Sequence, residues 1–432
     1  MSSLLDFPLP IVEDIVKFLC PHCYPARVRD QHCHHPACPS RPNDREGQAA
    51  LASLRRTNRL LNYIATPLLY HTPFCGYRLK AQQNVAETIL DARAELAQHV
   101  KSVHLDQSDF AESLLSGGVN ELIEKAAGRL EAVADVDRSW TPYFLALIAG
   151  TCTNMEELCI LAHDGEQSPV PFSAPGSLPK LERLAVSHWD TEGGFDISSL
   201  RDLFAAAPNI TSLSVCNMVS IQPGMNMQNM KEINLYNTVL EADELRILLE
   251  QCPKLEQFNF HISDACVTLE GWPTAREVQD VISHTSPGLK HLRLEVGEGV
   301  FDLNEATEED TLRSLKLLKC LEELELQEEF LYPGTMVQNP SDAGVLEPEA
   351  LVDLLPASIR TVRIGMVEGG GVRPLVPAIL MLGRVCKEEF PHLESIWFHN
   401  LAVDADAERQ ARELFEGQGV TFRSELQPYW EE

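Results

Sequence analysis

A short apolar pattern recurs along the last three quarters of the chain. An apolar residue is followed by two residues of any kind, a second apolar residue, one further residue and a third apolar residue. Because the last two apolar residues alternate with another side chain, a short strand would direct both of them to one face. Successive copies begin 55, 26, 29, 20, 25, 34, 32, 38 and 34 residues apart, and most of these periods are typical of solenoids. The copies are Val100-Val103-Leu105, Met155-Leu158-Ile160, Leu181-Leu184-Val186, Ile210-Leu213-Val215, Met230-Ile233-Leu235, Leu255-Phe258-Phe260, Leu289-Leu292-Leu294, Leu321-Leu324-Leu326, Ile359-Val362-Ile364 and Leu393-Ile396-Phe398.

Between these copies lie segments whose apolar residues have the spacing of an α-helix. Residues 242–250 and 274–284 place apolar residues on one helical face, and Thr274 with Glu277 is typical of a capping box. Residues 420–422 indicate a closing strand. Strand–helix units that all run in one direction predict an α/β fold with a parallel sheet. We therefore expect an irregular solenoid of about ten to eleven repeats over residues 76–432.

The strand pattern resembles that of the leucine-rich repeat family, in which LxxLxL forms the concave strand. The family's asparagine, three residues after the last leucine, is replaced here by other residues, such as Thr238 and Gly297. Side chains that flank the apolar strand positions would face the concave side. Exposed aromatic and arginine residues are frequent anchors of interfaces; the alternative for each such residue is that it serves only the fold. The predicted partner-binding residues are Tyr236, His261, Arg293, Arg363, Trp397 and His399, with His104 in the same type of position.

The first 75 residues differ from the repeats. Residues 7–19 and 49–71 have the apolar spacing of helices, with Pro67 expected to end the second. These segments resemble the F-box motif: Phe7, Pro8, Ile11, Val12, Ile15, Val16 and Leu19 match its first part, and Leu51, Leu54, Asn58, Leu61, Ile64, Ala65, Pro67, Leu68 and Tyr70 match its second. The resemblance implies that Pro8, Ile11, Ile15, Leu19, Leu54 and Leu68 contact a Skp-type adaptor. The alternative is that these residues form the core of the N-terminal segment itself.

A cysteine- and histidine-rich insert, residues 20–46, separates the two F-box-like segments. Residues 20–38 contain 8 cysteines and histidines in 19 positions, whereas the whole chain contains 12 cysteines and 14 histidines in 432. A CxxC pair offers two thiolates from one turn, and two more ligands complete a tetrahedral zinc site. The predicted structural zinc ligands are Cys20, Cys23, Cys33 and Cys38, with His32 or His35 as alternates. The alternative is a histidine-rich loop with adventitious metal affinity.

Charge and composition exclude some classes of function. Acidic residues outnumber basic ones by 64 to 35, and the resulting net charge of −29 would repel nucleic acid. We find no apolar run of the length that a membrane helix needs and no basic segment before the first apolar residues. A cytoplasmic or nuclear location with reduced cysteines is therefore expected. The sequence contains no GxSxG, GxxxxGK[ST], HExxH or GxGxxG motif, so we do not expect an enzyme.

The F-box resemblance, followed by leucine-rich-type repeats, implies a function. We expect the substrate-recognition subunit of a cullin-type (SCF) ubiquitin ligase, in which the F-box segment docks the Skp-type adaptor and the repeats bind a target protein. The alternative is a stand-alone repeat scaffold or inhibitor that binds a partner without any ligase.

Overall fold

The computed structural model of the chain divides into two compact units. One unit comprises Met1–Asp190, Gly194–Cys216 and Met225–Met227, and the other comprises Thr191–Gly193, Asn217–Gly224 and Gln228–Glu432. The structure describes residues 7–20, 22–23, 42–73, 88–89, 94–106, 150–162, 174–188, 194–262, 272–296, 310–331, 346–365, 375–399 and 405–425.

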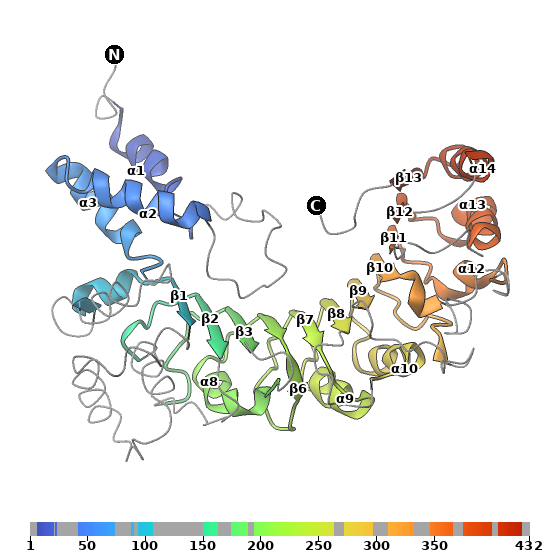
Figure 1. Ribbon diagram of the computed structural model, residues 1–432, viewed down its shortest axis with the longest axis horizontal. Coiled ribbons are helices and arrows are strands. Elements are labelled where there is room, and N and C mark those ends of the chain that lie inside the picture. The colour runs from blue at the N-terminus through green and yellow to red at the C-terminus, as the bar shows by residue number, and fades with distance from the viewer. Residues whose placement is uncertain are drawn as a thin grey trace. The chain divides into compact units, whose positions relative to one another are not determined.

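Three helices open the first unit (Figure 1): α1 (Leu9–Lys17), α2 (Pro42–Leu54) and α3 (Arg59–Leu69). Their apolar faces meet in one small core, because each helix carries aliphatic residues at helical spacing. Its buried members are Val12, Val16, Cys20, Leu51, Leu61, Ile64, Ala65 and Leu68.

The prediction of one helix over residues 49–71, ended by Pro67, is wrong. Asn58 has an extended backbone, and its side chain accepts a hydrogen bond from the Leu61 amide at 2.9 Å. It therefore caps a new helix, as asparagine commonly does, and separates α2 from α3. Pro67 lies inside α3. Since the helix ends two residues later, the missing amide of Pro67 disturbs only its last turn.

All ten copies of the apolar pattern, and the closing segment, form strands of one sheet. The strand order in this eleven-stranded sheet is β1-β2-β3-β5-β7-β8-β9-β10-β11-β12-β13, and the described pairings are parallel. The predicted α/β class with a parallel sheet is confirmed. The strands are β1 (Ser102–Asp106), β2 (Glu157–Ala162), β3 (Arg183–His188), β5 (Ser212–Cys216), β7 (Glu232–Thr238), β8 (Gln257–Ile262), β9 (His291–Val296), β10 (Glu323–Gln327), β11 (Thr361–Gly365), β12 (Ser395–His399) and β13 (Thr421–Glu425), while β4 (Phe195–Asp196) and β6 (Met218–Ser220) form a separate pair.

Helices follow most strands and cover one face of the sheet within each unit (Figure 1). The apolar strand residues, such as Phe258 and Leu292, are buried beneath them. The predicted capping box at α10 is confirmed, because Thr274 and Glu277 exchange both hydrogen bonds. The helices are η4 (Ala94–His99), η5 (Ile197–Leu200), α8 (Arg201–Ala206), α9 (Ala242–Glu250), α10 (Ala275–Thr285), η7 (Glu328–Leu331), α12 (Ala350–Leu354), α13 (Val376–Glu389) and α14 (Ala405–Glu416). None of the helices in the described part is long and apolar enough to cross a membrane.

One hydrogen-bond arrangement repeats at the start of the strands. The amides of Lys290 and His291, for example, both donate to the carbonyl of Glu256 at the preceding strand, at 2.8 and 3.0 Å. At the first strand, the amides of Lys101 and Ser102 donate to the carbonyl of His71 at 2.9 Å. His71 follows α3, so the end of the N-terminal helices takes the place of a preceding repeat.

Candidate metal centre and interaction surfaces

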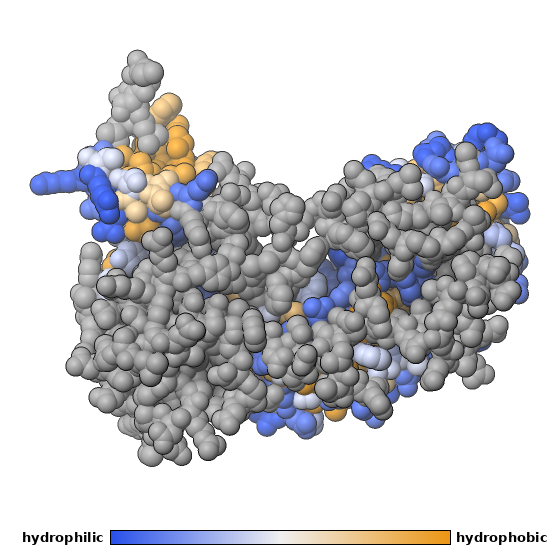
Figure 2. Space-filling view, viewed as in Figure 1, coloured by the Kyte–Doolittle hydropathy of each residue, from blue (hydrophilic) through white to orange (hydrophobic). Residues whose placement is uncertain are grey.

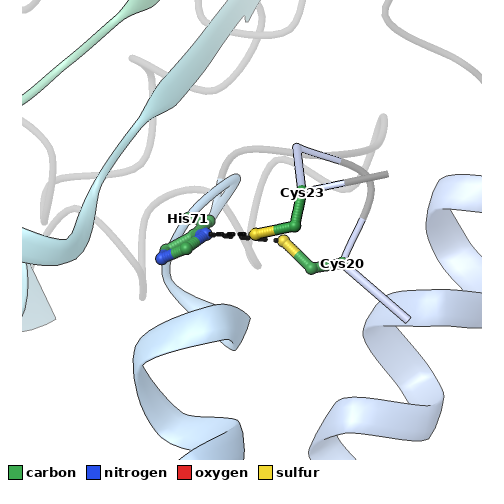
Figure 3. Close-up of side chains that lie close together, drawn as sticks. All are labelled: Cys20, Cys23 and His71. Carbon is green, nitrogen blue, oxygen red and sulfur yellow. Dashed lines mark hydrogen bonds between the residues drawn. The ribbon is translucent and has the colours of Figure 1, made fainter. Parts of the chain in front are cut away.

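Two cysteines and one histidine come together where α1 and α3 end (Figure 3). The Nδ1 atom of His71 lies 3.5 Å from Sγ of Cys20 and 3.3 Å from Sγ of Cys23. All three potential ligand atoms lie within 4.8 Å of one another. Thiolates and imidazoles are the ligands of structural zinc sites. The group could therefore hold a metal ion.

The helix ends explain this geometry. Cys20 is 1% exposed and packs in the core of the N-terminal helices, where its thiol donates to the carbonyl of Leu68 at 3.7 Å. Its backbone amide donates to the carbonyl of Lys17 at 3.0 Å, which turns the chain back after α1. Three residues later, Cys23 returns to the same place, half-buried. The CxxC spacing thus presents both sulfur atoms to His71.

The pKa values of the two thiols shift in opposite directions. The hydrogen bond between them, together with burial, raises the pKa of Cys20. The same hydrogen bond lowers the pKa of Cys23, and the neighbouring His22 and His71 lower it further against the opposing effect of burial. Because the thiolate is the form that binds metals, Cys23 is the group that is ready to act as a ligand.

A histidine between the cysteines connects this centre to the sheet. Nε2 of His22 lies 3.2 Å from a carboxylate oxygen of Glu156, which precedes β2 and also forms an ion pair with Lys101. Burial lowers the pKa of His22, but the interaction with Cys23 and the carboxylates of Glu157 and Glu156 outweigh it and leave the pKa raised. Burial raises the pKa of Glu156, but Lys101 and then His22 outweigh it and leave that pKa lowered. The pKa shifts thus favour a protonated His22 beside an ionised Glu156.

The metal prediction is answered in part. Cys20 and Cys23 lie together as expected, whereas Cys33 and Cys38, and the alternates His32 and His35, lie outside the described residues. The all-thiolate composition therefore stays a prediction. Sequence reasoning missed His71, which stands 48 positions from Cys23. Only the packing of α3 against α1 brings His71 to the cysteines, and its position in the sequence gives no local signal of this role.

The predicted adaptor contacts do not share one environment. Pro8, Ile11 and Ile15 are exposed, Leu19 and Leu54 are partly buried against the core, and Leu68 is buried within it at 6% exposure. Exposed apolar side chains lie on α1 and at its two ends: Ile11 and Ile15 within the helix, Phe7 before its N-cap and Phe18 at its C-cap, each 40–47% exposed. These four residues are called the α1 stripe below. Figure 2 shows hydrophobic surface at these N-terminal helices.

Three of the predicted partner-binding residues lie in one row across neighbouring strands. The register pairs Arg293 with Glu325, Glu325 with Arg363, Arg363 with Trp397, and Trp397 with Arg423. Glu325 accepts from Arg293 and from Arg363 at 3.2 Å each. The guanidinium carbons of Arg363 and Arg423 lie 5.1 and 4.3 Å from the Trp397 ring centroid. These five residues form the mid-strand row.

The other predicted partner-binding residues lie near this row. His261 is half-buried, and its Nδ1 accepts from the Asn237 amide at 3.3 Å. Tyr236 lies at an irregularity in β7, next to Asn237 with a φ of 48°. His399 is in register with Gly365 and Glu425. Sequence reasoning missed Glu325 and Arg423, although both occupy the same strand position as Arg293 and the pattern could have identified them.

Two comparisons with known proteins found no match. No protein-family model matches the chain, and no curated protein matches its sequence.

Proposed function

We propose that this chain is the substrate-recognition subunit of a cullin-type ubiquitin ligase, acting in the cytoplasm or nucleus. The α1 stripe would dock a Skp-type adaptor, and the strand face of the sheet would bind the target protein. Such a receptor binds its two partners and catalyses no reaction itself. The F-box resemblance of residues 7–19 and 51–70, and the repeat-like parallel sheet that follows, support this proposal.

The α1 stripe is the observation that carries the proposal. α1 already buries Val12 and Val16 in its own core, yet it leaves Phe7, Ile11, Ile15 and Phe18 40–47% exposed. Ile11 and Ile15 are four residues apart and therefore lie on one side of the helix, Phe18 follows at its C-cap, and Phe7 precedes its N-cap Pro8. Contiguous exposed apolar side chains mark interaction surfaces. Covering the exposed half of each would contribute about 1 kcal/mol, so the stripe would supply part of the docking energy.

The adaptor complex tests this role. Ile11→Asp with Ile15→Asp, in the full chain, should weaken binding to a purified Skp-type adaptor by at least ~100-fold, since two charges would be buried in an apolar interface. Leu317→Asp is the matched control: Leu317 is 61% exposed and belongs to the other unit, so its substitution should leave adaptor binding unchanged. Circular dichroism of each variant confirms folding. Adaptor binding that survives the double substitution, or an unaltered chain that binds no adaptor, would favour the stand-alone scaffold instead.

The mid-strand row is the proposed centre of target binding, together with Tyr236, His261 and His399. Arg363 and Arg423 stack on Trp397, and cation–π contacts of this kind hold guanidinium groups in place. Ordered arginine and tryptophan side chains lose little entropy when a partner binds, which is why they dominate interface energetics.

We further propose that Cys20, Cys23 and His71 hold a structural zinc ion. Two thiolates and an imidazole are typical zinc ligands, and the depressed pKa of Cys23 favours the ligand form. The ion would join the ends of α1 and α3, which a small three-helix core alone holds weakly. Elemental analysis of the purified full chain should show one zinc per chain, and Cys20→Ser with Cys23→Ser should abolish it.

A further inference from the structure

We propose that His22 is the fourth ligand of this metal centre, through Nδ1, and that Glu156 orients its ring. The metal would then fix the N-terminal helices to the first strands of the sheet. This inference rests on the proposed zinc site and specifies its donor set and its mechanical role.

The two ring nitrogens of His22 are in different situations. Nε2 lies 3.2 Å from Glu156, whereas Nδ1 is buried without a partner at hydrogen-bond distance in the part of the chain that the structure describes, although His22 and Cys23 are close enough to shift each other's pKa. A buried polar atom without a partner is costly, and a metal ion would satisfy it. The ring stands edge-on to His71, with 5.4 Å between centroids and an interplanar angle of 88°. The ligand atoms within 4.8 Å of one another belong to Cys20, Cys23 and His71, so the ring of His22 would have to move toward them to complete the site.

The partner of Nε2 supports this assignment. Histidines that bind a metal through one nitrogen usually donate the other N–H to a carboxylate, which fixes the tautomer and the ring plane. Glu156 is the carboxylate beside Nε2 of His22, and it also forms an ion pair with Lys101. Two cysteines and two histidines make a closed tetrahedral zinc site. This donor set differs from the four thiolates expected from the insert alone.

The mechanical role follows from where the ligands are anchored. Cys20 is anchored in the core of the N-terminal helices. The backbone carbonyl of His71 accepts hydrogen bonds from the amides of Lys101 and Ser102 at the start of β1. The His22 side chain contacts Glu156 just before β2. One ion would therefore connect α1 and α3 with both strands, within a single unit.

X-ray absorption at the zinc edge, on the full chain, tests the donor set. We expect two sulfur and two nitrogen neighbours. His22→Ala should lower zinc affinity at least ~10-fold in competition with a chromophoric chelator, and Cys33→Ser with Cys38→Ser should leave it unchanged. Four sulfur neighbours, or loss of zinc on replacing Cys33 and Cys38, would overturn the assignment of His22 while leaving a zinc site. A chain that binds no zinc would refute the zinc proposal itself.

Glu156 has a matched control in a later strand. Glu256 occupies the equivalent position, and its carboxylate pairs with Lys290 at 2.9 Å. Among the described residues, no histidine ring forms an ion pair with that carboxylate. Glu156→Ala should lower zinc affinity ~10–100-fold, as for other outer-shell partners of zinc ligands, and Glu256→Ala should not change it. Glu156→Gln, which retains an oxygen acceptor, should restore part of the affinity. Equal effects of the two alanine variants would show that Glu156 acts only on general stability.

Hydrogen exchange tests whether the metal connects the N-terminal helices to the first strands. Zinc removal from the unaltered full chain should speed exchange of the Lys101 and Ser102 amides at least ~10-fold, because their acceptor, His71, loses its anchor. The Lys290 and His291 amides make the same bonds to Glu256 and should keep their rates. Unchanged exchange at Lys101 and Ser102 in the zinc-free chain would refute the mechanical role.

Discussion

Glu328 and Glu329 are adjacent carboxyl groups buried directly after β10. Glu328 is fully buried and Glu329 is 9% exposed. Burial raises the pKa of Glu329 from 4.5 to about 7, because a carboxylate without water is disfavoured. One of its carboxyl oxygens is buried without a hydrogen-bond partner in the described part of the chain. Ionisation of this side chain therefore opposes folding.

Glu329→Gln should remove a pH dependence of stability. Between pH 4.5 and about 7 the folded chain retains a proton that the unfolded chain releases, so stability falls as the pH rises through this window and stays reduced above it. The variant should match the unaltered chain near pH 4 and exceed it at pH 8, by at most about 3 kcal/mol. Urea unfolding at several pH values measures the difference. Exposed Glu347, replaced by glutamine, is the control, and parallel profiles for Glu329→Gln and the unaltered chain would contradict the prediction.

At the scale of elements, α1 and α2 meet at a glycine. A Cβ atom at Gly47 would stand 2.3 Å from the backbone carbonyl oxygen of Leu19. That atom belongs to the backbone, so a side chain at position 47 must push the end of α1 away. Leu19 directly precedes Cys20, and the displacement therefore reaches the metal centre.

Gly47→Ala should destabilise the N-terminal helices by about 1–3 kcal/mol, the usual cost of overpacking, and should weaken zinc binding as well. Gly150→Ala, in the same unit, is the control, because no neighbouring atom of the described residues lies within 4 Å of a Cβ there. Thermal unfolding and chelator competition measure both effects. If the two variants behave alike, the close approach of α1 and α2 has no energetic role.

The sequence predicts best what local physics determines. The strands follow from alternation of apolar residues, α9 from helical spacing, and α10 from helical spacing with a capping signal, so all were predicted close to their bounds. The break at Asn58 was missed because its capping bond, rather than the continuous apolar spacing, decides where α3 begins. His71 was missed because its role depends on helix packing. The pattern places Glu325, Trp397 and Arg423 at the same strand position as Arg363, but the strand register is needed to show which of them are neighbours.

At the scale of the whole molecule, acidic charge exceeds basic charge by 64 − 35 = 29. Many described basic side chains are already engaged: Arg360 with Glu322 and Glu394, and Arg412 with Glu408 and Glu416. The surplus carboxylates therefore repel one another through solvent. Exposed ion pairs contribute only about 0.2–1 kcal/mol each, and the repulsion between surplus carboxylates opposes this attraction.

We expect repulsion to prevail, so that added salt stabilises the protein. Raising NaCl from ~10 to ~150 mM shortens the screening length from ~30 to ~8 Å. This suppresses repulsion between carboxylates on different repeats, while the attraction within ion pairs of 2.5–4 Å is reduced much less. The midpoint of thermal unfolding should rise by a few degrees over this range. Choline chloride at equal ionic strength should act alike, since screening does not depend on the cation. A midpoint that falls with salt would show that the ion pairs between strands, such as Lys290 with Glu256, stabilise the sheet more than the charge surplus opposes it.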